Sequence, residues 1–402
     1  MSKPGLHAIA AEHVFDGAAV RERTAVVVDG TRIADLVPMT ELPRAISVRV
    51  LPEGAWLAPG FIDLQVNGGG DVLFNDQPTV QGVCTIAAAH RKFGTTGLLP
   101  TLITDSPEKM RLALDTIHAA VDREPSVLGL HLEGPYLSSE RPGVHDVRHI
   151  RRPGAHDLAM LTARRNGVLL VTLAPEVVPP GFIAQLVGAG VRVALGHSMA
   201  SYRQTQAAMA EGLMGFTHLF NAMRPLASRE PGPIAQALES PEAWYGLIVD
   251  GVHVDPAMLR LALRGLGRPL LVTDAMPPVG GTRSTFSLHG DTISVNDGCC
   301  VSQDGTLAGT ILDMATAVGN CVRLLGVPLP DALRFASAHP AIVLGLERVL
   351  GRLAPGYRAD LVAFNANDMT VLATWVAGTA MPGTSEVPEF PPSLFESDKK
   401  NL

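Results

Sequence analysis

VRVALGHSMASYRQTQAAMAEGLMGFTHLF, residues 191–220, contains the pattern that decides the fold. Two short apolar runs, at 191–197 and 214–220, flank a more polar stretch of helical character. Apolar runs that alternate with helices are typical of βαβ units, whose parallel strands are buried on both faces. Each run also carries a histidine at or near its carboxyl end, in GH and THLF. We therefore predict a strand–helix–strand unit with polar groups at its strand ends.

The same alternation extends along the chain in both directions. Six further apolar runs bring the total to eight: GFIDLQV (60–66), TTGLLPTL (95–102), VLGLHLE (127–133), VLLVTLAP (168–175), YGLIVDGVH (245–253) and PLLVTDA (269–275). Eight parallel strands that alternate with helices predict a (β/α)8 barrel of the TIM type. Such a barrel carries its active site at the carboxyl ends of its strands.

The two ends of the chain differ from this central part. Residues 1–58 and 352–385 contain short β-rich runs and turns, and we expect them to form one small β-sandwich module. The barrel is expected to occupy residues 59–351, including a Gly-rich, β-like insertion at 284–309. The segment 386–402 contains proline and charged residues without periodicity, which predicts a flexible tail.

Composition restricts the classes of partner. The 402-residue chain has a formal net charge of −7 and no run of Lys or Arg, so nucleic acid and membranes are not expected partners. Its four cysteines have no CxxC spacing, and no apolar segment has the length of a signal peptide or a bilayer span. We therefore expect a cytoplasmic protein that acts on a small molecule.

Five ionisable residues end five separate core runs: Glu133, His197, His218, His253 and Asp274. One such residue alone would more often be structural, but burying several unpaired charges is costly, so the group indicates a shared site. Imidazole and carboxylate groups bind catalytic divalent metals, usually as three protein ligands with one open position. We predict that Glu133, His197 and His218 are the ligands. Asp274, at the end of the eighth run, is the candidate general base and acid.

The motifs around these residues resemble the amidohydrolase superfamily and, within it, the N-acetylglucosamine-6-phosphate deacetylases. The resemblance extends from PGFIDLQVNG (59–68) to GRLAPGYRADLVAFN (351–365). Seven motifs carry it: HLEGPYL (131–137), PGVHD (142–146), VTLAPE (171–176), GHS (196–198), THLFNAMRPLASREPG (217–232), DGVHVD (250–255) and LVTDAM (271–276).

The resemblance implies a reaction and a substrate. The enzyme would convert N-acetylglucosamine-6-phosphate to glucosamine-6-phosphate and acetate, in amino-sugar catabolism and recycling. Metal-bound hydroxide would attack the acetyl carbonyl, with Asp274 as base and then acid and with His145 orienting the carbonyl. The sugar phosphate would contact four residues, the last reaching in from the second subunit of a homodimer: Asn221, Ala222 through its backbone, His253 and Arg229.

The first barrel strand departs from the common superfamily pattern. Most relatives carry His-x-His at its end, whereas this chain has Gln65-Val66-Asn67. Amides are weak ligands for zinc, and some deacetylases with the same replacement hold a single metal. The resemblance therefore implies one divalent ion per subunit, zinc in preference to iron, cobalt or manganese. Gln65 and Asn67 mark a possible strand-one site.

Two other functions remain open at this point. A related amidohydrolase, such as a dihydroorotase-like enzyme or an N-acyl amino acid hydrolase, would act on another N-acyl or cyclic amide; the NAMRPLASREPG loop (221–232) argues against it. A metal-free, non-catalytic scaffold would explain the missing His-x-His. His131, two residues before Glu133 on the same face of the strand, is either a supporting residue of the site or a packed core histidine.

Overall fold

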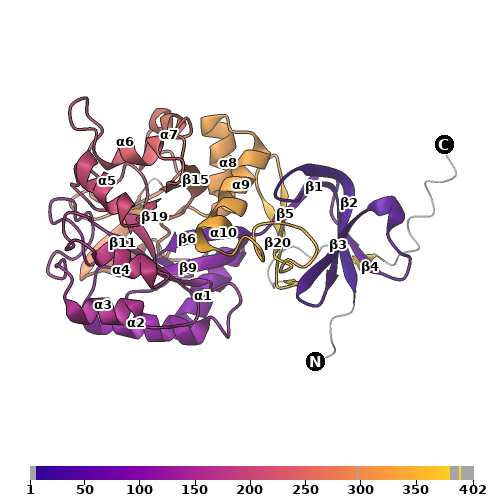
Figure 1. The fold of residues 1–402 in the computed structure, drawn as a ribbon. Helices are drawn as coiled ribbons and strands as arrows, with labels where there is room; N and C mark the ends of the chain where they lie inside the picture. Colours follow the sequence, from indigo (N-terminus) through magenta and orange to yellow (C-terminus); the bar gives the residue numbers. More distant parts are fainter. Residues whose placement is uncertain (1–5, 297, 381–388, 391–402) are drawn as a thin grey trace. The chain divides into compact units, whose positions relative to one another are not determined.

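A computed structural model of the chain describes residues 6–296, 298–380 and 389–390 (Figure 1). Contacts divide the chain into two compact units, Met1–Ile62 with Arg91–Thr96 and Pro328–Leu402, and Asp63–His90 with Gly97–Val327. The domain boundaries expected from the sequence, at 58/59 and 351/352, stay a prediction. The expected flexible tail at 386–402 lies outside the described residues, apart from Glu389–Phe390.

Eight parallel strands form one sheet in sequence order, which confirms the predicted barrel. They are β6 (Phe61–Val66), β9 (Thr95–Ile103), β10 (Gly129–Glu133), β11 (Val168–Leu173), β12 (Arg192–Leu195), β13 (Gly215–Phe216), β14 (Trp244–Leu247) and β15 (Arg268–Leu271). The first and last strands meet where Val66 forms a parallel bridge with Ala275. Beside this bridge, the backbone N–H of Asp274 donates to the Gln65 carbonyl at 3.0 Å. These contacts nearly close the barrel.

Several strands end earlier than their apolar runs predict. β13 covers only Gly215–Phe216 of the run 214–220, and β14 ends at Leu247 although its run continues to 253. After β13 the backbone turns into left-handed conformations, with φ of +32° at His218 and +80° at Phe220. A residue in that conformation cannot continue a strand. The polar ends of these runs therefore lie in loops at the mouth of the barrel.

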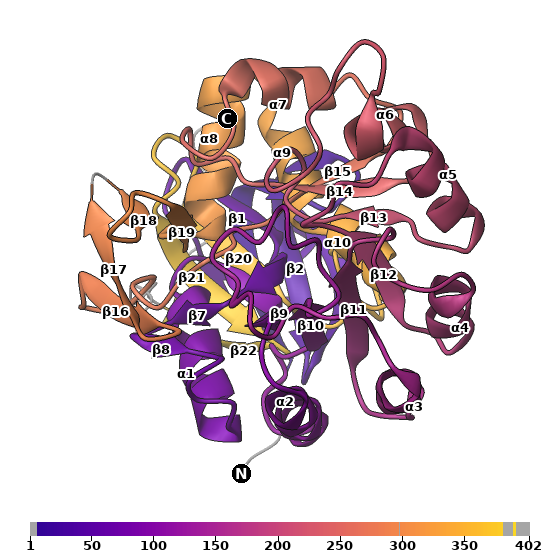
Figure 2. The same cartoon turned by 90° about the vertical axis from the view of Figure 1, so that its left-hand side faces the viewer.

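Helices surround the strands (Figure 2). They are α1 (Val80–Arg91), α2 (Pro107–Ala120), α3 (Ala155–Thr162), α4 (Phe182–Gly188), α5 (Tyr202–Ala210), α6 (Gly232–Glu239), α7 (Pro256–Ala262) and α8 (Met314–Leu325). Ser106, Ser201, Asp255 and Asp313 each cap a helix by accepting a hydrogen bond from a backbone N–H of the first turn. Within the described residues, no helix combines the length and the apolarity needed to cross a bilayer.

The predicted insertion after the eighth strand is a small antiparallel sheet. It consists of β16 (Thr285–Leu288), β17 (Asp291–Asn296), β18 (Cys299–Val301) and β19 (Leu307–Thr310), and its core includes Leu73 of the hairpin β7 (Gly68–Gly69) and β8 (Val72–Leu73). Gly309 has φ of +68°, and a Cβ there would lie 2.8 Å from the Asp274 carbonyl oxygen. Glycine therefore allows β19 to approach the end of β15 closely.

Strands from both ends of the chain share one nine-stranded sheet, as expected (Figure 1). Its order is β22 (Thr379–Ala380), β21 (Val371–Val376), β20 (Leu361–Asn365), β5 (Ala55–Pro59), β1 (His7–Phe15), β2 (Val20–Asp29) and β3 (Arg32–Pro38), with β4 (Ser47–Val50) beside β1 and β23 (Glu389–Phe390) beside β4. Ile9 and Ala11 of β1 face one apolar core, which includes Trp375, while Ala8 and Ala10 face another. The same unit contains η1 (Met39–Glu41), α9 (Leu329–Ala336) and α10 (Ala338–Leu344).

We expect Trp375→Ala to lower the free energy of unfolding by about 3–5 kcal/mol, because Trp375 is 2% exposed and its truncation leaves a cavity. Calorimetry, together with unfolding followed by circular dichroism, measures this loss of unfolding free energy. Ile342→Ala in the same unit removes a side chain that is 39% exposed and should cost less than about 1 kcal/mol. Equal losses in the two variants would contradict the assignment of Trp375 to the core.

Candidate active site

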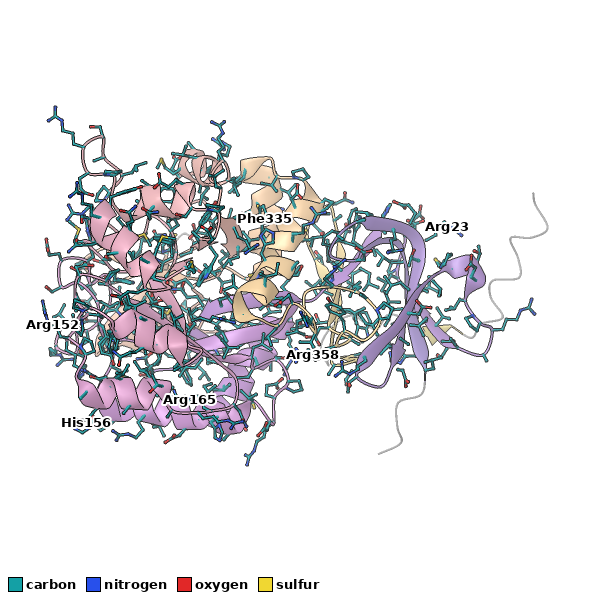
Figure 3. The ribbon with its side chains drawn as sticks, viewed as in Figure 1. Arg23, Arg152, His156, Arg165, Phe335 and Arg358 are labelled. Carbon is teal, nitrogen blue, oxygen red and sulfur yellow. The ribbon has the colours of Figure 1, made fainter. Side chains whose placement is uncertain are left out.

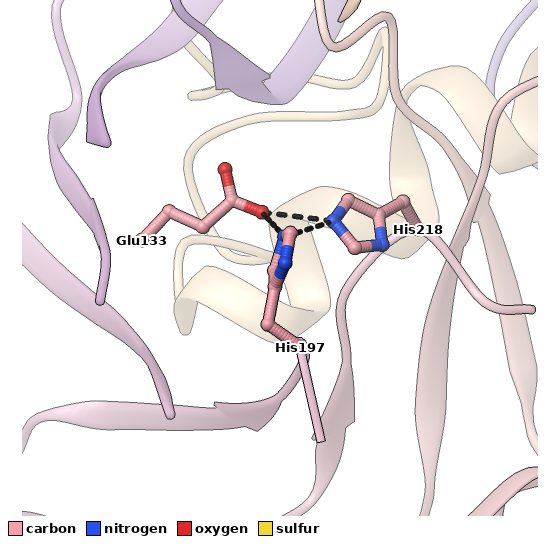
Figure 4. A group of neighbouring side chains, drawn as sticks. All are labelled: Glu133, His197 and His218. Carbon is pink, nitrogen blue, oxygen red and sulfur yellow. Dashed lines mark hydrogen bonds and ion pairs between the residues drawn. The ribbon is translucent and has the colours of Figure 1, made fainter. Parts of the chain in front are cut away.

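Three buried side chains from the carboxyl ends of three different strands, or from the loops just after them, converge on one point (Figure 4). Glu133 ends β10, while His197 and His218 follow β12 and β13. The Oε1 atom of Glu133 lies 2.8 Å from Nε2 of His218 and 3.2 Å from Nε2 of His197, and the two Nε2 atoms are 3.1 Å apart. These are the three ligands predicted from the sequence, and they form a group that could hold a metal ion.

The chemistry of this group fits a divalent metal. Nδ1 of His197 lies 2.9 Å from the carbonyl oxygen of Arg141. Because a carbonyl only accepts, Nδ1 carries a hydrogen, and Nε2 is the ring nitrogen that faces Glu133 and could bind a metal. Ligands at about 2.0–2.1 Å in a tetrahedral zinc site lie roughly 3.3 Å from one another, close to the separations observed here. Glu133, His197 and His218 are therefore already spaced as ligands of one ion.

Electrostatics keep Glu133 ionised despite its burial. Burial alone would raise the pKa of this carboxyl, but the hydrogen bonds and charges of His197 and His218 hold the pKa well below its ordinary value. For His218, burial lowers the pKa, but the hydrogen bond and charge of Glu133 raise it above the ordinary value. A buried carboxylate of this kind needs a positive partner, which a metal ion supplies.

His145 lies beside the three ligands, as the sequence motif suggested. It is buried, and its ring centroid is 4.3 Å from that of His197. The backbone N–H of Thr104 donates to Nδ1 of His145 at 3.3 Å, so the hydrogen of this imidazole is on Nε2. Burial keeps the pKa of His145 well below its ordinary value. The neutral ring therefore offers an Nε2–H donor beside Glu133.

Asp274 is linked to Glu133 by the Gln65 amide of the first strand and is also bound by the Asn67 amide. Gln65 Nε2 donates to Asp274 Oδ1 at 3.0 Å and lies 3.2 Å from Oε2 of Glu133, and Asn67 Nδ2 donates to the same Asp274 oxygen at 2.6 Å. Burial, and then the negative charge of Glu133, raises the pKa of Asp274 to about 6. At the possible strand-one site, both amide nitrogens thus face carboxylates as hydrogen-bond donors.

A buried aspartate below this network was missed by the sequence reasoning. Asp63 accepts hydrogen bonds from Thr273 Oγ1 at 2.5 Å and from the backbone N–H groups of Gln65 at 3.2 Å and Thr273 at 3.3 Å. Burial raises the pKa of Asp63 to about 7. It ties β6 to the segment that leads into Asp274. The period-two rule, which places Asp63 and Gln65 on one face of the strand, was the available signal.

His131 is a packed core histidine. Its Nδ1 lies 3.1 Å from Thr101 Oγ1 and its Nε2 lies 2.8 Å from Thr172 Oγ1, so both ring nitrogens are satisfied by hydroxyl groups. Burial lowers its pKa to about 4.

His156, by contrast, is not part of the core. Its side chain on α3 is exposed and lies at the periphery of its unit (Figure 3).

A cavity of about 250 Å³ is lined by the three candidate metal ligands and Asp274. Its wall includes Asn221, Ala222 and His253, three of the four residues expected to contact the sugar phosphate. Nδ1 of His253 lies 2.5 Å from a carboxylate oxygen of Asp250, a partner that sequence reasoning missed although both lie in the DGVHVD motif. Arg229 is exposed and lines neither this cavity nor the one beyond Ala222 and His253.

Backbone strain is concentrated around this cavity. Ten non-glycine residues of the described chain have positive φ, and five belong to the site or its rim: His197 (+48°), His218 (+32°), Phe220 (+80°), Ala222 (+48°) and Asp274 (+52°). L-residues rarely adopt this conformation, and such residues cluster at functional sites. Histidine and aspartate adopt positive φ more often than most residues, but Phe220 and Ala222 give no such signal, so residue type alone does not locate the cluster.

Comparison with known proteins agrees with this geometry. The profile of the Amidohydrolase family matches residues 56–381. The chain is 41% identical to the N-acetylgalactosamine-6-phosphate deacetylase of Shewanella sp. (strain ANA-3), over 80% of this chain and 82% of that protein. It is 35% identical to the N-acetylglucosamine-6-phosphate deacetylase of Haemophilus influenzae, over 88% and 93%. The crystal structure of N-acetylglucosamine-6-phosphate deacetylase from Pasteurella multocida superposes with a TM-score of 0.90 at 36% identity, covering 94% and 99%. This chain therefore belongs to the amidohydrolase family.

Proposed function

We propose that this chain hydrolyses the acetamido group of N-acetylglucosamine-6-phosphate, releasing glucosamine-6-phosphate and acetate in amino-sugar metabolism. The observation that carries the proposal is the convergence of Glu133, His197 and His218 in one cavity with Asp274. Similarity to deacetylases over most of the chain favours this substrate class over other N-acyl or cyclic amides. The substrates in the names of those two relatives are epimeric sugars, but both carry an acetamido group and a 6-phosphate.

One divalent ion per subunit would be held by Glu133, His197 and His218, with zinc preferred over iron, cobalt or manganese. When bound, such an ion polarises the acetyl carbonyl and lowers the pKa of water. A count of one is supported by the strand-one amides. Gln65 and Asn67 direct their NH₂ groups to carboxylates, and the lone pair of an amide nitrogen is delocalised into its carbonyl, so these nitrogens are not available to a second metal.

Proton transfer would be the task of Asp274. As a carboxylate it removes a proton from the attacking water, and as the C–N bond breaks it returns a proton to the amine nitrogen. Its raised pKa, about 6, suits both steps near neutral pH. The Nε2–H of His145 would donate to the carbonyl oxygen and stabilise the negative charge that develops there. The products are acetate and the free amino sugar.

The phosphate would lie at the other end of the cavity, against Asn221, the backbone of Ala222 and His253. Arg229 would reach it from the second subunit of a homodimer. This role is supported by the exposure of Arg229 in its own chain, where its guanidinium makes no hydrogen bond or ion pair with described residues. We place the enzyme in the cytoplasm, because four cysteines without disulfide spacing suit a reducing compartment.

Acetate release tests the function directly. We expect the wild type to hydrolyse N-acetylglucosamine-6-phosphate in a chelator-sensitive manner and to contain about one metal ion per chain. Glu133→Gln should lose both the metal and the activity, because an amide replaces the only anionic ligand. The exposed Glu140→Gln should keep both. Hydrolysis confined to N-acetylgalactosamine-6-phosphate would reassign the epimer, and a Glu133→Gln protein with full metal content would exclude Glu133 as a ligand.

Asp274→Asn should retain the metal ion and lower kcat by about 10²- to 10⁴-fold, because the proton acceptor is lost while all three ligands remain. Elemental analysis of the purified variant and acetate-release kinetics give the two quantities. Loss of the metal together with kcat would indicate a ligand instead of a base, and near-normal turnover would exclude Asp274 from proton transfer.

The pH profile follows from the same carboxyl group. A raised pKa means that Asp274 is protonated, and therefore inactive as a base, below about pH 6. The wild-type kcat/KM should thus fall by about tenfold per pH unit below that value and level off above it. The residual activity of Asp274→Asn should lack this acidic limb. A wild-type profile that stays flat to about pH 5 would contradict the assignment.

A further inference from the structure

Arg141 lies on the loop that follows β10, at the border of the site. A second cavity, of about 440 Å³, adjoins the first and shares Ala222 and His253 with it. Arg141 lines the second cavity, and among the described residues no other lysine or arginine lines either one. Asp255 also lines the second cavity, and its carboxylate accepts the backbone hydrogen bond that caps α7.

The guanidinium of Arg141 is not paired with a carboxylate in the described part of the chain. Its side chain donates a hydrogen bond from Nε to the Met199 sulfur at 3.1 Å, and sulfur is a weak acceptor. Arg148, seven residues further along, donates instead to both carboxylate oxygens of Asp146. Arg141 therefore keeps its two terminal NH₂ groups for a ligand, whereas Arg148 does not.

The position of Arg141 is fixed relative to the metal ligands. Its carbonyl oxygen accepts the hydrogen of His197 Nδ1, and its side chain contacts Met199. The neighbouring Ser198 donates its backbone N–H to the carbonyl oxygen of Ala222 at 3.0 Å. One hydrogen-bonded network thus connects Arg141 both to a metal ligand and to the segment expected to hold the phosphate.

We propose that Arg141 supplies a cation to the phosphate of the substrate from the same chain, beside His253. The planar guanidinium can donate two parallel hydrogen bonds to phosphate oxygens. Nδ1 of His253 is held by Asp250, which leaves Nε2 as its group for the ligand. This inference rests on the proposed function, since it assigns the end of the cavity that binds the 6-phosphate. Phosphate recognition then does not depend on Arg229 of a second subunit alone.

The test compares Arg141→Met with Arg148→Met, a matched control that removes an exposed arginine of the same loop. Glucosamine-6-phosphate binding by calorimetry should weaken about ten- to a hundredfold in Arg141→Met and stay unchanged in the control. In acetate-release kinetics, KM for the phosphorylated substrate should rise while kcat changes little. Turnover of N-acetylglucosamine, which lacks the phosphate, should not change. Arg141→Lys should restore only part of the binding, because lysine keeps the positive charge but lacks the planar guanidinium that donates two parallel hydrogen bonds.

Unchanged binding of glucosamine-6-phosphate in Arg141→Met would overturn the inference. An equal loss of kcat on both substrates, with loss of metal, would also overturn it, because the residue would then act only by orienting His197. The proposed function is judged separately, by wild-type acetate release. A wild type that binds glucosamine-6-phosphate through Arg141 and releases no acetate would exclude the reaction and leave the phosphate site in place.

Discussion

The meeting of the first and last barrel strands is the constraint on which the rest of the site depends. Val66 bridges Ala275, and Asp63 holds Thr273 from within the barrel. Because the sheet closes there, the strand-one amides lie beside Asp274 and Glu133, residues far apart in the sequence. An open sheet with the same strands would place Glu133 and Asp274 toward opposite edges. Closure therefore creates the site as well as the core.

Charge balance is the second organising principle of the site. Glu133 and Asp274 are two carboxylates in a region of low polarity, and they respond differently. The two imidazoles hold the pKa of Glu133 well below its ordinary value, whereas burial and the charge of Glu133 raise that of Asp274 to about 6. One carboxylate is thereby suited to binding a cation and the other to exchanging a proton. Gln65 joins the two without adding charge.

Much of this arrangement could be predicted from the sequence, because it depends on periodicity and on strand-end chemistry. The eight apolar runs correspond to the eight barrel strands, and Glu133, His197 and His218 are brought together as expected. Features that depend on three-dimensional contact could not be predicted. The carbonyl of Arg141 fixes the tautomer of His197 across 56 positions of sequence, and the early end of β13 follows from left-handed backbone at His218. Spacing shows neither, and histidine, although more frequent in left-handed backbone than most residues, still adopts it uncommonly.

The sheet β16–β19 has a consequence for how substrate range can diverge in such proteins. Thr306, Leu307 and Gly309 from this insertion line the cavity together with the barrel residues, although the candidate metal ligands and Asp274 all come from the barrel strands and the loops that follow them. This part of the cavity wall and the candidate catalytic groups are thus encoded by separate segments. Substitutions at Thr306 or Leu307 can change the shape of the cavity without moving the candidate ligands or Asp274, whereas Gly309 is fixed by its close approach to the Asp274 backbone.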